Sequence, residues 1–460
     1  MTRLNMDSGN DLFIRYLSEA IGAGKAKVAL SALGEPASVS VRMNPCKLPA
    51  SGHFQGKVSG VPWSEYGLML EDRPVFTLDP LLHAGCYYVQ DSSSMFVGHV
   101  LRKILPEVHA DGPLRVLDLC AAPGGKTTDA AASLRSVLGD GFLLVSNEVI
   151  RSRASVLAAN VALWGDPSVM VTSADPAVIG RNEGFFDIIL ADVPCSGEGM
   201  FRKDADSAAQ WSEENVEHCV ARQRRILADV WPALAEGGLL LYSTCTFNRY
   251  ENDGNVRWAA DTLGAEPYDP EAAPDWPEII RTEYGYSLVP GFVKGEGQYC
   301  AVLRKTGGKP RMKVSGNGRK RANGVLPAGV FSIPVTEIVK GDIVKAVPEV
   351  IADDAAWLES AVRTVASGCA AFSRKGKDLV PCADLALSVC LGKDVFPRAD
   401  TDRKTALRFL HRDTFSLPDA EKGYVMICFE GHPLGFVKNL GNRCNSLHPQ
   451  ERRIRMDIGC

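Results

Sequence analysis

Two apolar segments of this chain each end in a short polar turn that carries a cysteine. The first, Phe186–Leu190, runs into Asp192 and Cys195, and the second, Gly238–Tyr242, runs into Cys245. Short apolar runs bounded by turn residues are typical of strands buried in a parallel sheet. In an open α/β sheet, ligands bind just beyond the carboxyl ends of such strands. The sequence therefore predicts two thiols and a carboxylate at one edge of a sheet.

Composition narrows the class of protein. The 460-residue chain has ordinary apolar content and a net charge of −4, which is typical of a globular protein with two or three domains. No apolar stretch approaches the roughly 18 uncharged residues of a membrane span, and the N-terminus lacks the apolar core of a signal peptide. The 13 cysteines form no Cys-x-x-Cys pair, which suits a reducing cytosol better than a disulfide framework or a zinc site. We therefore expect a cytoplasmic protein with no membrane segment and no metal.

A glycine-rich turn follows the predicted strand 114–119. It consists of Cys120, Ala121, Ala122, Pro123, Gly124, Gly125 and Lys126. A strand, a tight turn and a helix N-terminus form a nucleotide-binding corner. A P-loop would need glycine at position 120, and the dinucleotide fingerprint G-x-G-x-x-G is missing. Neither a triphosphate nor a nicotinamide dinucleotide is therefore favoured.

Acidic residues follow three successive predicted strands. Glu148 lies about 20 residues beyond the glycines, at the spacing where a carboxylate binds ribose hydroxyls. Asp175 and Asp192 lie at the ends of the next two strands. A single acid at a strand end is usually solvated. Three in register above one glycine-rich turn predict a nucleoside-type cofactor.

Two thiols and an acid suit the methylation of carbon 5 of a cytosine. That carbon is a poor nucleophile until a thiolate adds at carbon 6 and breaks the aromaticity of the ring. An acid near the N3/N4 edge neutralises the developing charge, and a second group removes the carbon-5 proton and expels the first thiol. Cys245, Asp192 and Cys195 provide that set, without a metal. A base stacked in a helix cannot reach them, so the target cytosine must be unpaired or flipped out.

Three blocks of sequence resemble the signatures of the RNA cytosine-5 methyltransferases, namely Asp118–Thr127, Asp192–Gly197 and Tyr242–Cys245. Ser40–Pro45 and Tyr88–Met95 are similar to the N-terminal lobe of that family. The region around Gly435–Lys438 resembles the PUA-like tail of its bacterial RsmF type, which modifies small-subunit ribosomal RNA. The resemblance implies S-adenosylmethionine as the cofactor and RNA as the partner, with 16S ribosomal RNA favoured and transfer RNA as the alternative.

The resemblance also implies roles for the site residues. Residues 120–126 would surround the methionine end of the cofactor, Glu148 would bind its ribose and Asp175 its adenine edge. Asp192 would lie between the cofactor and the cytosine. Cys245 would be the nucleophile, and Cys195 would assist product release. Lys126 would orient the loop or touch the target phosphate.

Alternatives stay open at this point. DNA cytosine-5 methyltransferases attack from a Pro-Cys corner, which here would be Cys195, but that relative lacks the second thiol. The presence of both thiols favours Cys245 as the nucleophile. A non-catalytic RNA-binding or ribosome-assembly factor on the same scaffold is a second class. A Rossmann oxidoreductase is a third, which the missing dinucleotide fingerprint opposes. Monomer is the default oligomeric state.

The predicted fold class is α/β, with a Rossmann-like methyltransferase sheet that has helices on both faces. An N-terminal α/β RNA-recognition lobe (1–105) precedes this catalytic domain (106–304). A basic, glycine-rich linker (305–324), a small α/β domain (325–391) and a PUA-like RNA-binding domain (392–460) follow it. The linker is predicted to be flexible, with Lys and Arg residues that suit either phosphate contact or a solvated tether.

The N-terminal lobe has two interpretations. The alternation of residues 38–43 predicts a half-buried strand with Arg42 on its solvent side. The lobe is either a structural cap on the next domain or a substrate-recognition lobe with Arg42 and Tyr88 near the cleft.

Overall fold

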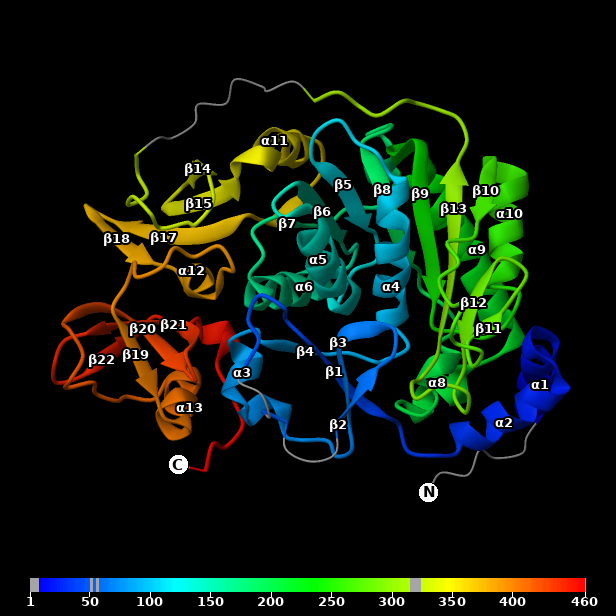
Figure 1. Ribbon diagram of the computed structural model, residues 1–460, viewed down its shortest axis with the longest axis horizontal. Coiled ribbons are helices and arrows are strands. Elements are labelled where there is room, and N and C mark those ends of the chain that lie inside the picture. Colours follow the sequence, from blue (N-terminus) through cyan, green and yellow to red (C-terminus); the bar gives the residue numbers. More distant parts are fainter. Residues whose placement is uncertain (1–7, 50–52, 55–57, 315–323, 460) are drawn as a thin grey trace.

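The computed structural model describes residues 8–49, 53–54, 58–314 and 324–459. A large central sheet is accompanied by an N-terminal sheet and by two small C-terminal sheets, which lie at the left of Figure 1. None of the helices in these ranges is long and apolar enough to cross a membrane.

Ten strands form the central sheet, in the order β11-β12-β13-β9-β8-β5-β6-β7-β16 with β10 paired to β13. Its parallel strands are β5 (Leu114–Asp118), β6 (Phe142–Asn147), β7 (Val169–Thr172), β8 (Phe186–Asp192) and β9 (Leu234–Thr244). Antiparallel strands extend one edge: β13 (Gln298–Lys305), β10 (Ala265–Tyr268), β12 (Gly285–Leu288) and β11 (Ile280–Arg281).

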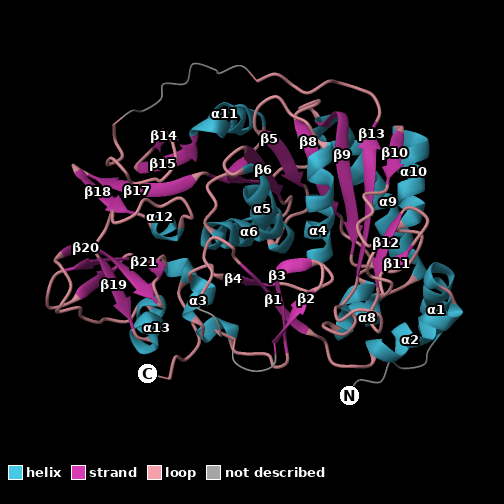
Figure 2. Cartoon of the chain, in the orientation of Figure 1, coloured by secondary structure: helices cyan, strands magenta, loops and turns pink. Residues whose placement is uncertain are grey.

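Both faces of this sheet are covered, because successive apolar residues of each strand point to opposite sides. Ile188 and Leu239 belong to one hydrophobic core, and their neighbours Ile189 and Leu240 belong to the other. The first core includes residues of α4 (Met95–Ile104), α5 (Gly125–Leu138) and α6 (Arg151–Trp164), which Figure 2 shows in front of the central strands. The second includes residues of α7 (Pro176–Gly180), α9 (Glu213–Val230), α10 (Asp253–Leu263) and α11 (Ala352–Ala361). The predicted Rossmann-like sheet with helices on both faces is thereby confirmed.

The N-terminal lobe is built around a four-stranded sheet in the order β2-β3-β1-β4. Its elements are α1 (Ser8–Ile21), α2 (Ala23–Leu33), β1 (Val39–Met43), β2 (Val58–Val61), β3 (Ser64–Leu70), α3 (Pro80–His83) and β4 (Tyr87–Val89). Helices α1 and α2 pack with Trp211 and Phe247 of the catalytic part. Trp211 follows the short helix α8 (Ala205–Gln210).

Arg42 of β1 is buried, so the prediction that it lies on the solvent side is wrong. Only 2% of its side chain is exposed. Its guanidinium donates to Gln90 Oε1 at 2.8 Å and to Thr128 Oγ1 at 2.6 Å, and it lies 4.6 Å from the centre of the Trp164 ring. The physical reason is that the polar face of β1 packs on α5 and α6 of the central domain. Arg42 therefore ties the lobe to the helix that follows the glycine-rich turn.

Two small sheets follow in the C-terminal part. The first contains β14 (Val335–Lys340), β15 (Ile343–Pro348), β17 (Cys369–Lys375) and β18 (Asp378–Pro381), followed by α12 (Ala383–Leu387). The second contains β19 (Arg398–Thr401), β20 (Gly423–Phe429), β21 (His432–Asn439) and β22 (Cys444–Ser446), with α13 (Arg403–His411). One strand of the 325–391 segment leaves its own sheet: β16 (Thr364–Ser367) pairs antiparallel with β7 of the central sheet.

The described part of the predicted linker is docked on the catalytic part and is not a flexible tether. Lys305 Nζ donates to the carbonyls of Trp231 and Leu234 at 2.9 and 2.6 Å. Arg311 Nε lies 2.7 Å from Asp187 Oδ1. These two cations bind protein groups, whereas the sequence had left phosphate contact and a solvated tether as alternatives for this segment. Residues 315–323 of the same predicted linker lie outside the described residues.

Candidate active site

The glycine-rich turn joins β5 to α5 as predicted from the sequence. Gly124 has a φ of 118°, in the left-handed region that favours glycine, and a Cβ built there would lie 3.3 Å from Leu157 Cδ1. The carbonyls of Ala122 and Pro123 accept hydrogen bonds from Arg153 and Asn160 of α6, both at 2.8 Å. The turn is therefore held against α6.

Asp118 closes β5 at the foot of this turn. It is fully buried, and burial raises the pKa of its carboxyl group to about 7. Thr127 Oγ1 donates to Asp118 Oδ2 at 2.6 Å. The other oxygen, Oδ1, is buried and has no hydrogen-bond partner in the protein. A buried acceptor without a partner is unfavourable and suits a ligand that brings a donor.

Two of the predicted cofactor acids, Glu148 and Asp175, each have partners a few residues away in the sequence. Glu148 Oε1 accepts from the Ile150 amide at 2.9 Å, and Oε2 lies 3.1 Å from Arg153. Asp175 Oδ1 accepts from the Ala177 amide at 3.0 Å and caps α7. Both acids lie at the ends of neighbouring strands, as expected.

Asn147, the last residue of β6, connects the ends of three strands. Its Nδ2 donates to the carbonyls of Leu119 and Ala174, at 3.2 and 3.0 Å, and its Oδ1 accepts from Thr172 Oγ1 at 2.9 Å. No role is predicted for Asn147 from the sequence. An amide fits here because it donates and accepts at once.

The two thiols meet at the edge formed by β8 and β9. Cys195 Sγ and Cys245 Sγ are 3.1 Å apart, and both residues are partly buried. The hydrogen bond with Cys245, together with burial, raises the pKa of the Cys195 thiol well above its usual value. Cys195 is therefore protonated at neutral pH.

Asp192 and Lys126 lie beside this thiol pair. Lys126 Nζ is 2.9 Å from Asp192 Oδ2. Asp192 Oδ1 accepts from Ser243 Oγ at 2.8 Å and from Gln298 Nε2 at 3.3 Å. Burial is the largest single influence on the pKa of Lys126 and lowers it, but the charge and hydrogen bond of Asp192, together with the charges of Cys245 and Asp118, outweigh burial, so the net shift is upward. Lys126 is therefore a fixed positive charge within the influence of Cys245.

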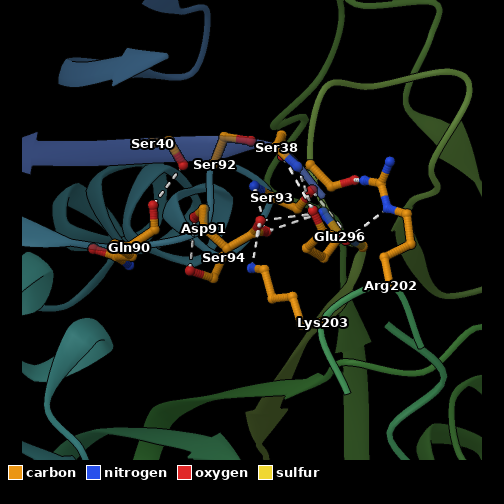
Figure 3. A network of polar contacts seen from close by, with 12 residues as sticks. Ser38, Ser40, Gln90, Asp91, Ser92, Ser93, Ser94, Arg202, Lys203 and Glu296 are labelled. Carbon is orange, nitrogen blue, oxygen red and sulfur yellow. Dashed lines mark hydrogen bonds and ion pairs between the residues drawn. The ribbon is translucent and has the colours of Figure 1, made fainter. Parts of the chain in front are cut away.

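A polar network fixes the turn beyond Cys195 against the N-terminal lobe (Figure 3). Arg202 Nε lies 2.7 Å from Glu296 Oε2, and Glu296 Oε1 accepts from the Ser38 amide at 3.0 Å. Lys203 Nζ lies 3.4 Å from Asp91 Oδ2. The lobe thus contacts the loops around the thiols. A Cβ on Gly125 would lie 3.5 Å from Tyr88 Cε1, so Tyr88 borders the glycine-rich turn, while Arg42 is buried.

The residues present fit S-adenosylmethionine. The glycine-rich turn, Glu148, Asp175 and Asp192 follow β5, β6, β7 and β8, which are neighbours in one sheet. The unpartnered Asp118 Oδ1 lies at the first of these strand ends. Among the described residues, no three His, Cys, Asp or Glu side chains come together in a way that could hold a metal ion.

The fold and this site define the class of protein: an S-adenosylmethionine-dependent methyltransferase of the RNA cytosine-5 type, with two thiols. Three family models match the chain: 16S rRNA methyltransferase RsmB/F over residues 107–304, the N-terminal domain of 16S rRNA methyltransferase RsmF over 10–92, and the methyltransferase RsmF PUA domain over 396–454.

Similar proteins agree with these matches. The ribosomal RNA small subunit methyltransferase F of Cronobacter sakazakii is 30% identical over 96% of this chain and 95% of its own, and that of Escherichia fergusonii is 30% identical over 96% of both. The chain therefore belongs to the RsmF branch of the RsmB/F family of 16S rRNA methyltransferases. The predicted family, enzyme class and cofactor are confirmed, and the oxidoreductase and non-catalytic alternatives are set aside.

Solved structures show the same fold. A methyltransferase homologue from Pyrococcus horikoshii has a TM-score of 0.53 at 24% identity, covering 64% of this chain and 94% of its own. NSun6 from Pyrococcus horikoshii, solved with SFG, has a TM-score of 0.50 at 18% identity and covers 64% of this chain and 98% of its own.

Proposed function

We propose that this enzyme methylates carbon 5 of a cytosine in 16S ribosomal RNA through a covalent adduct with Cys245. The observation that carries the proposal is the pair of sulfurs 3.1 Å apart beside the Lys126–Asp192 ion pair. The names of the relatives support the choice of RNA. The cofactor supplies an activated methyl group, and residues 120–126, Glu148 and Asp175 hold it.

Cys245 adds to carbon 6 of the flipped cytosine as a thiolate. Lys126 favours that thiolate because it is a fixed positive charge nearby. Asp192 lies against the N3/N4 edge of the base, where it stabilises the protonated ring that forms on addition. Ser243 and Gln298 hold one oxygen of Asp192 and Lys126 holds the other, so its orientation is set before substrate binds.

Cys195 acts after the methyl group has been transferred. The carbon-5 proton is lost to water, and the electron pair of the broken C–H bond restores the aromatic ring as the bond between Cys245 and carbon 6 breaks. Cys195 is protonated and assists this departure as a proton donor. Since the two sulfurs are in contact, the thiolate of Cys245 that leaves can receive a proton from Cys195 directly.

The parts of the chain have separate tasks in this proposal. Residues 1–105 and 392–460 bind RNA, and residues 106–304 hold the cofactor and the reacting base. Residues 305–324 join this part to residues 325–391, which complete the central sheet at β7. The enzyme works as a monomer in the cytoplasm.

Opposite outcomes for the two cysteine variants test this function. Cys245→Ala should abolish both methyl transfer and covalent capture of RNA. Cys195→Ala should permit attack but slow release, so that an RNA adduct resistant to denaturant accumulates. Bisulfite mapping of 16S ribosomal RNA and transfer RNA from cells with and without the gene identifies the substrate. The assignment fails if Cys245→Ala still methylates, if the adduct forms in the reverse pattern, or if only transfer RNA changes.

A further inference from the structure

Two buried acids connect the loops that carry the two cysteines. Glu198 lies three residues after Cys195, and its Oε2 accepts the backbone amides of Phe247 and Asn248, at 2.6 and 3.1 Å. Those amides belong to the loop that follows Cys245. The acid of the first cysteine loop thus holds the backbone of the second.

The second loop returns the same contact. Glu251, six residues after Cys245, accepts the backbone amide of Ser196 at 3.0 Å. The hydroxyls of Ser196 and Thr246, the residues that directly follow the two cysteines, are 3.0 Å apart. The Gly199 amide donates to the Cys245 carbonyl at 2.8 Å. We call Glu198, Glu251 and Asn248, with the bonds they make between the two loops, the acid clamp.

Asn248 joins the two acids to each other. Its side-chain amide donates to Glu198 Oε1 at 2.9 Å and to Glu251 Oε1 at 2.8 Å. All three residues are at most 1% exposed. Burial of two neighbouring carboxylates is unfavourable, and burial together with the charge of Glu198 raises the pKa of Glu251 to about 7. A group that is unfavourable for stability and remains buried is a candidate for a functional role.

The hydrogen bonds require carboxylates at both positions. Glu251 accepts from the amide of Ser196 and from the side-chain amides of Gln223 and Asn248, and all of these groups are donors. Gln223 is fixed in that orientation because its oxygen accepts from Asn255 at 2.6 Å. Glu198 likewise accepts from Trp211 Nε1 at 3.0 Å. A glutamine in either place would turn an NH₂ group toward one of these donors.

We infer that Glu198 and Glu251 are positioning residues that hold the two cysteine sulfurs in contact. The inference rests on the proposed roles of Cys195 and Cys245. The acids do not touch either sulfur and act through the backbone of the residues that follow each cysteine. Attack on carbon 6 needs Cys245 alone, whereas release of product needs Cys195 beside it. The acid clamp therefore serves the release step.

This assignment predicts a distinct kinetic defect. Glu198→Gln and Glu251→Gln should lower kcat roughly 10- to 100-fold, the effect of moving a reacting group by about 1 Å. KM for the RNA and binding of S-adenosylhomocysteine should change little. The RNA adduct should accumulate as it does in Cys195→Ala, although to a smaller extent.

A measurement on the protein without RNA or cofactor tests the geometry itself. Dibromobimane alkylates two neighbouring thiols, and the cross-linked Cys195–Cys245 peptides can be quantified by mass spectrometry, with Cys195→Ser and Cys245→Ser as blanks. In Glu198→Gln and Glu251→Gln the rate of this cross-link should fall roughly tenfold. Asp354→Asn is the matched control, because it disturbs another buried carboxylate and should leave the rate unchanged.

Each outcome decides between a positioning role and none. Wild-type cross-linking in both folded glutamine variants overturns the inference, whatever their activity, and so does an equal fall in Asp354→Asn. Where an acid variant does not fold, Asn248→Ala removes the side-chain amide that joins the two acids, and unchanged cross-linking in that variant overturns the inference. If the wild type cross-links rapidly but does not methylate RNA, the proposed function fails while the geometry stands.

Discussion

A buried arginine links the catalytic sheet to the C-terminal part of the chain. Arg115 of β5 lies 2.8 Å from Asp354 of α11, and the two side chains are 4% and 8% exposed. Its guanidinium also donates to the Met312 carbonyl at 2.8 Å and lies 4.7 Å from the centre of the Phe185 ring. Arg115→Met would keep the apolar stem and remove every one of these polar contacts.

The loss of stability in Arg115→Met can be worked out from the groups that lose their partner. Methionine has similar reach and fills the space along Phe185. Asp354 then becomes a buried carboxylate without its partner, which costs about 3–5 kcal/mol. Because both side chains are almost fully buried, solvent does not weaken the pair. We expect Arg115→Met to lower the free energy of unfolding by about 3–5 kcal/mol, since the loss of the bond to Met312 only adds to this cost.

The assay is urea unfolding followed by two probes, because a chain with several sheets need not unfold in one step. The double variant Arg115→Met/Asp354→Leu is the informative control. Replacing both members of a buried pair by apolar groups is often neutral, so the double variant should recover most of the stability that the single variant loses. A loss below about 1 kcal/mol in Arg115→Met, or a further loss on adding Asp354→Leu, would refute the reasoning.

Two further predictions concern buried charges near the site. Arg42→Met should lower thermal stability but leave the salt dependence of RNA binding unchanged, because Arg42 is bonded to Gln90 and Thr128 inside the protein. A fall of about 0.7–0.9 in the slope of log K against log salt would instead indicate a phosphate contact. Asp118 has a pKa raised from 3.8 to about 7, so the folded protein retains a proton that the unfolded chain releases between these values. Through Asp118 the free energy of unfolding should therefore fall with rising pH in this window, by up to about 1.4 kcal/mol per pH unit, and Asp118→Asn should make the total fall shallower by that share, while Glu251, whose pKa is also raised to about 7, keeps its own. Urea unfolding of both proteins at about pH 5 and 7 measures the difference, and parallel curves would contradict it.

The thiol pair could be predicted from the sequence because its causes are local. Each cysteine directly follows an apolar strand, and adjacent parallel strands bring their carboxyl ends to one edge. In the structure, Asp192 of β8 is in register with Ser243 of β9, which sets both turns at the same level. The glycine-rich turn could also be predicted from the sequence, because glycine readily adopts the left-handed conformation that Gly124 has between a strand and a helix.

The burial of Arg42 could not be predicted from the alternation of polar and apolar residues in its strand. Period-two alternation states which residues share a face of a strand, but it does not state what covers that face. Here the polar face of β1 meets α5 and α6, so the arginine is bonded to Gln90 and Thr128. The basic segment at 305–314 was misjudged for a related reason. A basic, glycine-rich composition predicts an exposed segment. It does not reveal the carbonyls and the carboxylate that bind Lys305 and Arg311, because these groups come from distant parts of the chain.

The acid clamp was missed although its residues lie close to the cysteines in sequence. Glu198 and Glu251 look like surface acids, since glutamate is rarely buried without a partner. Their partners are backbone amides about 50 residues away, as in the bond from Phe247 to Glu198. A signal was present all the same. Each loop carries polar groups just after its cysteine: Glu198 lies three residues after Cys195, and Asn248 and Glu251 lie three and six residues after Cys245. Once the two turns are known to meet, these groups are available as hydrogen-bond partners for the neighbouring loop.

The catalytic domain includes residues beyond 304, where the sequence predicted its end, because a later strand covers the edge of the central sheet. Without β16, strand β7 would be an edge strand with free backbone groups, which proteins normally cover. Strand β16 pairs with it in antiparallel register, and the Ser173 amide donates to the Arg363 carbonyl at 2.9 Å, two residues before Asp175. Helix α11, just before β16, shares one hydrophobic core with β5, β6 and β8. A chain cut at 304 would expose both this core and the strand edge beside the adenine end of the proposed cofactor site, so the segment after the linker completes the fold that binds the cofactor.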